Sequence, residues 1–275
     1  MKKNSKSKNA LLWIISFIIM TAASVYQRLT GPTHPVQAKI EIEGTSYLFK
    51  LIRSHGSKAD ARIVLSIPDT SIHGIIAYKK INATETWEND SLVRLGKDLV
   101  GYMPHQPPAG KLEYDVILMK NNGIYHLTPK PVTIRFKGDV PPFILIPHIL
   151  LMFAAMLLSL RAGLEALVKG NNTYRLALLS TILLTIGGLV FGPLVQKFAF
   201  GQFWTGWPIG NDLTDNKTIA AIIFWLIATL QLKKDSSNRL WPILASIFTF
   251  FIFFIPHSLW GSQFDYRTGQ IKTGK

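Results

Sequence analysis

The sequence predicts a membrane protein of mixed class, in which an N-terminal anchor helix and a four-helix transmembrane unit flank an antiparallel β-sandwich. Three observations predict it. Five apolar runs are distributed along the 275 residues, the stretch between the first two alternates apolar and polar residues, and short basic segments flank the runs. With 48% hydrophobic residues and a mean hydropathy of +0.23, the chain is too apolar for an ordinary soluble domain of this length.

The N-terminal segment has the order of a membrane-targeting signal. Residues 1–10 carry four lysines and no acidic residue, and residues 11–27 form an apolar run. Charge followed by an apolar run is typical of a signal peptide or a signal anchor. No clear small-residue cleavage site follows, so we favour an uncleaved transmembrane anchor behind a cytoplasmic basic tail. Cleavage as a signal peptide stays open.

Residues 30–140 predict an extracytoplasmic β-sandwich. Short runs with period-two alternation appear, among them "VQAKIEIEG", "ARIVLSIP" and "KLEYDVILMK". Such alternation is typical of half-buried strands. Turn signals separate the runs, and Asn121-Asn122-Gly123 predicts a hairpin turn. About seven short strands over this length predict an antiparallel sandwich.

One segment of this region carries a family resemblance. "GYMPHQPPAGKLEYDVILM" resembles the E–F corner and F strand of an immunoglobulin or fibronectin-III-like domain, with Leu99, Pro104 and Tyr114 in the family's order. The resemblance implies an immunoglobulin-like sandwich in which the Tyr114 hydroxyl closes back on the upstream chain. The whole arrangement also resembles bacterial multi-pass membrane proteins with one anchor, a β domain and a four-helix membrane unit, a likeness that implies no activity.

Residues 141–261 predict the four-helix transmembrane domain. Its apolar runs are 141–160, 176–195, 219–232 and 240–260. A span needs about 20 apolar residues, so three runs qualify directly. The run at 219–232 is short unless it begins earlier, at 213. None of the four runs contains Asp, Glu, Lys or Arg, which disfavours a self-sufficient ion-coupled transporter.

The loop charges predict the orientation. The basic residues between runs gather in 161–175 and 233–239, on the same side as the lysine tail. Positive loops face the cytoplasm, so the chain is expected to make five spans, N-in and C-out. The β-sandwich, an outer loop at 197–217 and a tail at 262–275 are then extracytoplasmic. We expect the bacterial cytoplasmic (inner) membrane.

The charge and cysteine content exclude several functions. The net charge is +14, but residues 27–140 carry 15 basic and 11 acidic side chains. The remaining excess flanks apolar runs, which indicates topology signals rather than a nucleic-acid groove. The absence of Cys excludes disulfides, thiolate catalysis and Cys-based metal sites.

The stretch "GQFWTGWPIGNDLTDNKT", residues 201–218, is the main candidate site. Its aromatic rings suit the headgroup level of a bilayer, and Thr214 or Asp215 can cap the following helix. A functional interpretation adds that rings and oxygen acceptors together suit a small-molecule, headgroup or cation site. The candidate binding residues are Trp204, Trp207, Asn211, Asp212, Asp215 and Asn216.

A second candidate comes from the repeated "IPH" at Ile146-Pro147-His148 and Ile255-Pro256-His257. Both histidines are expected near the outer boundary, where two neutral imidazoles can ligate a metal or a haem iron. The structural alternative is that each histidine bonds a carbonyl freed by its proline, or reaches the interface. No cofactor is otherwise predicted.

The leading hypothesis is therefore a non-enzymatic membrane protein for binding or assembly. Its partners are the lipid bilayer and a membrane or extracytoplasmic protein or lipid-like ligand at the outer surface; nucleic acid is not expected. One alternative is a membrane redox or metal protein with His148 and His257 as ligands. Another is a membrane enzyme acting on a lipid-linked substrate, with Asp212 or Asp215 as acid or base.

Overall fold

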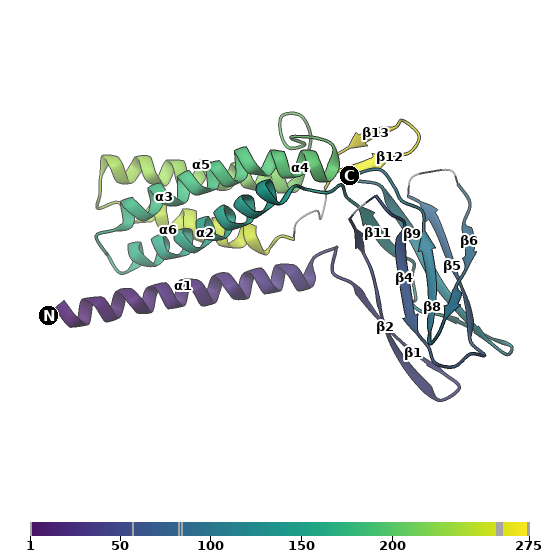
Figure 1. Cartoon of the computed structure of the whole chain (residues 1–275). Coiled ribbons are helices and arrows are strands. Elements are labelled where there is room, and N and C mark those ends of the chain that lie inside the picture. Colours follow the sequence, from purple (N-terminus) through teal and green to yellow (C-terminus); the bar gives the residue numbers. More distant parts are fainter. Residues whose placement is uncertain (1, 57, 82, 84, 257–260, 274–275) are drawn as a thin grey trace.

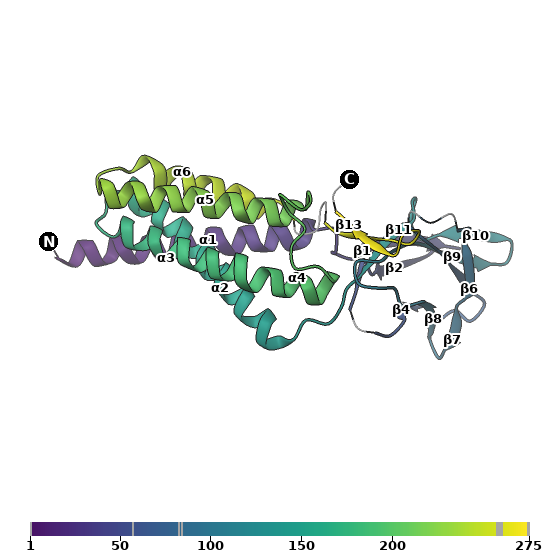
Figure 2. The same cartoon turned by 90° about the horizontal axis from the view of Figure 1, so that it is seen from above.

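The computed structural model describes residues 2–273 except 57, 82, 84 and 257–260. A helical unit and a β unit lie end to end (Figures 1 and 2). The N-terminus lies at the end of the helical unit farthest from the β unit, and the C-terminal strands lie where the two units meet. The mixed helical and β class is thereby confirmed.

Four helical stretches of the described chain are long and apolar enough to cross a membrane: Lys6–Thr30, Pro142–Leu167, Thr173–Phe200 and Leu213–Lys234. The helices among the described residues are α1 (Lys2–Thr30), α2 (Pro142–Leu167), α3 (Thr173–Thr185), η1 (Ile186–Phe191), α4 (Gly192–Phe200), α5 (Leu213–Lys234) and α6 (Leu240–Phe254). These stretches suit an integral membrane protein.

The last two helices differ in length from their apolar runs, and the first of them has the earlier start that the sequence allowed. The run expected to be short belongs to α5, which has 22 residues because it begins at Leu213. The run expected to be long yields α6, which has only 15 residues. It ends at Phe254 because Ile255 precedes a proline, which disfavours helical backbone there. At about 22 Å, α6 is shorter than the ~30 Å hydrocarbon core.

Helix α1 packs as a member of the helical unit. Met20 and Ala23 are buried against Met156 and Leu160 of α2. The Gln27 amide donates to the carbonyls of Phe253 and Ile255, at 2.6 and 3.1 Å. These carbonyls end α6 and have no following helical turn to bond. Gln27 therefore fixes the end of α1 to the end of α6.

The third apolar stretch contains a π-helical segment, η1. The Gly192 N–H donates to the Gly187 carbonyl, five residues back. Helix α5 approaches closely at this level: a Cβ added to Gly188 would lie 2.5 Å from Thr218 Cγ2. The glycines therefore allow α5 to pack closely beside the widened π-helical turn.

The helices extend beyond the apolar runs and include buried charges. Arg161 and Glu165 lie in α2 and Asp215 and Lys217 lie in α5; each is less than 9% exposed. The sequence places these residues in polar connections. The helices continue into those connections because caps and ion pairs satisfy their ends.

The β unit consists of strands between α1 and α2. They are β1 (Val36–Ile42), β2 (Thr45–Leu51), β3 (Ser54–His55), β4 (Ala61–Ser66), β5 (His73–Lys80), β6 (Glu88–Ser91), β7 (Val93–Leu95), β8 (Asp98–Met103), β9 (Lys111–Lys120), β10 (Gly123–His126) and β11 (Val132–Phe136). One sheet has the order β3-β11-β9-β5-β6, with β10 added beside β9. A second has the order β4-β8-β7, and β1 and β2 form a hairpin.

One apolar core joins these sheets. Buried residues of β1, β2, β4, β5, β8, β9 and β11 belong to a single cluster. The expected hairpin is present, since Lys120 pairs with Gly123 across Asn121 and Asn122. One pair departs from the antiparallel expectation: β3 runs parallel to β11. The Tyr114 hydroxyl donates to the carbonyl of Ile52 at 2.8 Å, 62 residues upstream.

The expected C-terminal tail is a β-hairpin on the β unit. Its strands are β12 (Gln263–Asp265) and β13 (Gln270–Lys272). The Phe264 N–H donates to the carbonyl of Ala109 at 3.0 Å. The Lys111 N–H donates to the Tyr266 hydroxyl at 3.1 Å. The hairpin therefore covers the end of the β unit nearest the helices.

Candidate functional site

The loop between α4 and α5 begins at Gly201, which ends α4 in the left-handed conformation with φ of 85°. It ends at Asp212, whose carboxylate accepts the Thr214 N–H at 2.8 Å and caps α5. The expectation that Thr214 or Asp215 is the cap is wrong, because the helix begins earlier, at Leu213. The loop therefore begins at a left-handed glycine and ends at a side-chain cap.

The two aspartates of the loop hold neighbouring segments together. Asp215 accepts the Thr205 N–H at 2.7 Å and lies 3.2 Å from its hydroxyl. Asp212 also accepts the Ser262 N–H at 3.2 Å. Thr205, Asp212 and Ser262 are almost completely buried. These carboxylates therefore tie the loop to α5 and to the residue that begins the C-terminal hairpin.

The other four predicted residues also lie in this loop or beside it. The Asn216 side-chain oxygen accepts the Trp207 N–H at 2.6 Å, and the Trp204 indole donates to the Trp207 carbonyl at 3.1 Å. The Asn211 N–H donates to the Thr273 hydroxyl at 3.4 Å. The Trp207 side chain is 70% exposed. The structure thus brings the six residues together: Trp204, Trp207 and Asn216 bond one another, and the other three bond further residues of the chain. Their role as ligand groups stays a prediction.

His148 bonds a neighbouring helix. Its Nδ1 lies 2.9 Å from the carbonyl of Gly187, at the start of the π-helical segment. The structural alternative expected a carbonyl freed by its own Pro147, and the partner is instead on η1. His257 lies outside the described residues. Within the described ranges, no group of three or more His, Asp or Glu is placed to hold a metal.

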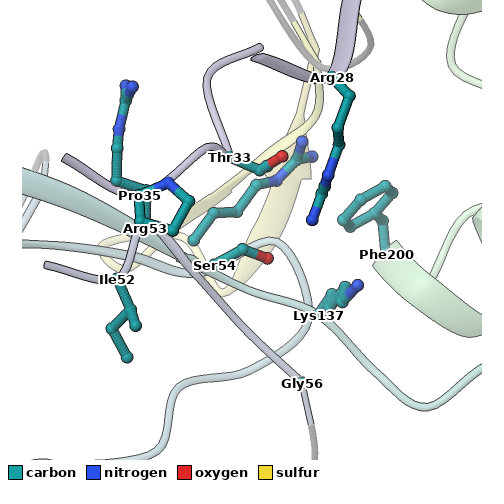
Figure 3. Close-up of a pocket in the computed structure, with 10 residues that line it drawn as sticks. Arg28, Thr33, Pro35, Ile52, Arg53, Ser54, Gly56, Lys137 and Phe200 are labelled. Atoms are coloured by element: carbon teal, nitrogen blue, oxygen red, sulfur yellow. The ribbon is translucent and has the colours of Figure 1, made fainter. Parts of the chain in front are cut away.

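A basic pocket lies where the helical and β units meet, and we call it the junction pocket. Its volume is about 380 Å³. The described residues that line it include four cations and no acidic residue: Arg28, Thr33, Pro35, Ile52, Arg53, Ser54, Gly56, Arg135, Lys137 and Phe200. In Figure 3, Arg28, Lys137 and Phe200 approach one another, and the Arg53 side chain extends away from them.

Strand register places the β-unit side of this pocket. Arg135 pairs with Ser54 across the parallel strands β11 and β3. Alternation along β11 sends Ile134 and Phe136 into the β core, so Arg135 faces the other way, toward the helices. The Gly138 N–H then donates to the carbonyl of Ala199 at 2.9 Å and joins the strand to α4.

Arg135 is the buried cation of the junction pocket. Its side chain is only 7% exposed, its Nη2 donates to the Ser262 carbonyl at 2.7 Å, and its guanidinium lies 3.9 Å from the Phe200 ring centroid. Its Nε has no hydrogen-bond partner among the described residues. Burial lowers the pKa of Arg135 to about 10, with the Asp212 charge acting in the opposite direction. The guanidinium therefore stays charged at neutral pH.

A second cation lies directly beside it. Lys111 pairs with Arg135 across β9 and β11. Burial, and then the charge of Arg135, lower the pKa of Lys111 to about 8. Like charges directly opposite on a sheet destabilise it. Arg28, Arg53 and Lys137 form no ion pair within the described part of the chain. The junction thus has an excess of positive charge, which suits an anion.

The junction pocket was not predicted from the sequence, although a signal exists. Arg28 directly follows the first apolar run, and Arg135 and Lys137 alternate with core residues just before the second run. Basic residues at the same boundary of two spans meet at one depth. Which of them share a cavity depends on the β3–β11 pairing, which the sequence does not indicate.

Comparisons of the chain with family models, with curated proteins and with solved structures give no match. The function is therefore argued from the junction pocket and the loop.

Proposed function

We propose that this chain is a non-enzymatic membrane protein that binds the anionic headgroup of a membrane lipid in the junction pocket, on the extracytoplasmic side. The observation that carries the proposal is Arg135, a buried guanidinium with an unpaired Nε, in a pocket lined by three further cations. A guanidinium suits phosphate because its donors match the phosphate oxygens. Within this proposal the β unit is an immunoglobulin-like domain.

The position of the pocket supports a lipid rather than a soluble anion. Arg28 lies in the last turn of α1, and Phe200 is the last residue of α4. Lys137 lies shortly before α2 begins at Pro142. Three apolar helices therefore end at the pocket, which places it at the depth of lipid headgroups when they cross the bilayer. Positive loops at the far end support the N-in, C-out orientation.

The enzyme and metal alternatives have less support. Asp212 and Asp215 are each engaged in hydrogen bonds within the chain, which favours a structural role over acid–base catalysis. The Nδ1 of His148 is occupied by the Gly187 carbonyl. Docking of a protein partner on the β unit stays a prediction without a specific surface.

The proposal is tested by native mass spectrometry of the full chain in a neutral detergent, titrated with phosphatidylglycerol or phosphatidylcholine. We expect preferential retention of phosphatidylglycerol. Arg28→Gln combined with Lys137→Gln should weaken that binding by roughly 30-fold, at about 1 kcal/mol for each cation near a membrane surface.

Matched charge removals provide the control. Lys39→Gln combined with Lys50→Gln removes two charges from exposed positions of β1 and β2, outside the pocket. This control should bind as the wild type does. Equal retention of the two lipids by the wild type, or equal losses in the two double variants, would contradict the proposal. Inorganic phosphate should not displace the lipid at millimolar concentration; if it does, the pocket takes a soluble anion.

A further inference from the structure

A second basic cavity lies at the end of the helical unit farthest from the β unit, and we call it the N-terminal cavity. Its volume is about 630 Å³, and it lies between the start of α1, the end of α2 and the turn before α3. Lys6, Lys8 and Arg161 line it, against the single carboxylate of Glu165. It shares no lining residue with the junction pocket.

Arg161 is the buried cation of this cavity. Its side chain is 2% exposed. Its Nη1 lies 2.7 Å from the Glu165 carboxylate, and its Nη2 donates to Asn9 Oδ1 at 2.6 Å. Its Nε has no partner among the described residues. The other Glu165 oxygen accepts the Asn172 N–H at 3.0 Å. Glu165 is therefore engaged on both oxygens, while Lys6 and Lys8 remain exposed.

A separate apolar groove lies on two of the same helices, α1 and α2, and on α6. It has a volume of about 240 Å³ and lies between Ile19 of α1, Leu160 and Leu164 of α2, and Ile247 and Phe250 of α6. Leu160 and Leu164 directly precede the two charged residues of the cavity in α2. A phospholipid has a charged headgroup and apolar acyl chains. The basic cavity at the helix ends suits the headgroup, and the apolar groove along the helices suits an acyl chain.

We infer that the N-terminal cavity binds the phosphate headgroup of an anionic phospholipid in the leaflet opposite the junction pocket, with one acyl chain in the apolar groove. Arg161 and the two lysines receive the phosphate oxygens, and Trp13, whose ring centroid lies 5.5 Å from the Arg161 guanidinium, borders the headgroup. The groove selects a lipid over a soluble phosphate. This inference does not depend on the proposed function.

Trp13 supplies a local probe. The full chain is reconstituted in phosphatidylcholine vesicles that contain a small fraction of phosphatidylglycerol with brominated acyl chains, or an equal fraction of brominated phosphatidylcholine. The Trp13 signal is the difference between the wild type and Trp13→Phe. We expect stronger quenching of Trp13 by the brominated phosphatidylglycerol.

Four variants and one control separate the headgroup and acyl-chain contributions. Lys6→Gln and Lys8→Gln should each reduce the preference for phosphatidylglycerol roughly fivefold. Arg161→Met combined with Glu165→Gln removes the buried ion pair without leaving a charge unpaired, and should abolish the preference. Ile247→Phe should weaken quenching by filling the groove, whereas Leu244→Phe, on the same helix but outside the groove, should not.

Equal quenching of wild-type Trp13 by the two brominated lipids would overturn the inference. So would an unchanged preference in both lysine variants. Soluble glycerol phosphate has the headgroup chemistry without acyl chains, so it should not compete at millimolar concentration; full competition would show that the cavity takes a free phosphate instead. Because the junction variants leave this cavity intact, either site can fail without the other.

Discussion

The α4–α5 loop and the junction pocket lie at the same end of the helical unit. The polar groups of the loop are hydrogen-bonded within the chain, whereas the cations of the pocket lack ionic partners among the described residues. In the loop, Asp212 and Asp215 accept hydrogen bonds from the chain itself. In the pocket, Arg28 and Lys137 have no ionic partner in the described part of the chain, and Arg135 keeps an unpaired Nε. Satisfied acceptors stabilise a fold, whereas unpaired cations in a cavity suit a ligand.

The largest effect on stability is expected for Asp215→Ala. The change leaves the buried N–H of Thr205 without an acceptor, which costs about 2 kcal/mol. The apparent melting temperature in detergent should fall by roughly 4 to 8 °C. Asp215→Asn keeps an acceptor for this N–H, so the melting temperature of this variant should fall less. A melting temperature unchanged by Asp215→Ala would contradict the claim that the loop stabilises the fold.

An effect of similar size is expected for Asp212→Ala, which removes the cap of α5 and leaves the buried Ser262 N–H without its acceptor. Loss of a cap costs about 1 kcal/mol. The C-terminal hairpin should also be cleaved faster by limited proteolysis, since Ser262 begins it. Asp98→Ala, on β8, is the matched control and should leave the cleavage rate unchanged. Equal cleavage of all three proteins would contradict the tie between loop and hairpin.

The half-buried Lys111, which lies beside the buried Arg135, predicts a pH dependence. The pKa of Lys111 is about 8 in the folded chain and has an ordinary value of 10.5. Between these values the unfolded chain binds more protons, so this residue makes the free energy of unfolding rise with pH. Below pH 8 the buried charge is fully unfavourable.

The measurement compares melting temperatures of the wild type and Lys111→Met from pH 7 to about 10. The wild type should gain stability relative to the variant across this window. A constant difference between the two proteins would show that Lys111 titrates normally in the folded chain.

The smallest effect is expected for Trp207→Ala. The ring is 70% exposed, so the change should alter the free energy of unfolding by less than about 0.5 kcal/mol. The loop's exposed rings suit the bilayer interface, so the wild-type indole emission should shift to shorter wavelength on reconstitution from detergent. A loss of stability as large as that of Asp215→Ala would mean that the ring packs inside the fold.

The features that the sequence predicted are those that depend on local pattern. Period-two alternation predicted the strands of the β unit, and Asn121-Asn122 predicted a hairpin that the structure contains. Helix ends were predicted less well: the start of α5 at residue 213 was an alternative with the wrong cap residue, and Pro256 shortens α6. The hydropathy of the runs alone predicts neither the start of α5 nor the end of α6.

The sequence predicted where the residues of the candidate site lie, but it did not predict the hydrogen bonds that they make within the chain. The loop residues gather as expected, yet their partners, such as Ser262 and Thr205, are distant in sequence or lack a recognisable motif. The junction pocket depends on the pairing of β3 with β11, two strands separated by most of the β unit. Long-range pairing of this kind is not encoded in any local pattern of residues.

The central claim is that the loop stabilises the fold and the junction pocket binds an anionic lipid. The most direct test measures phosphatidylglycerol retention and melting temperature on the same preparations of two proteins: Arg28→Gln combined with Lys137→Gln, and Asp215→Ala. The account predicts that the first protein loses lipid and keeps its melting temperature, while the folded fraction of the second keeps lipid and melts lower. The central claim would be contradicted if Asp215→Ala lost lipid and the variant Arg28→Gln combined with Lys137→Gln did not.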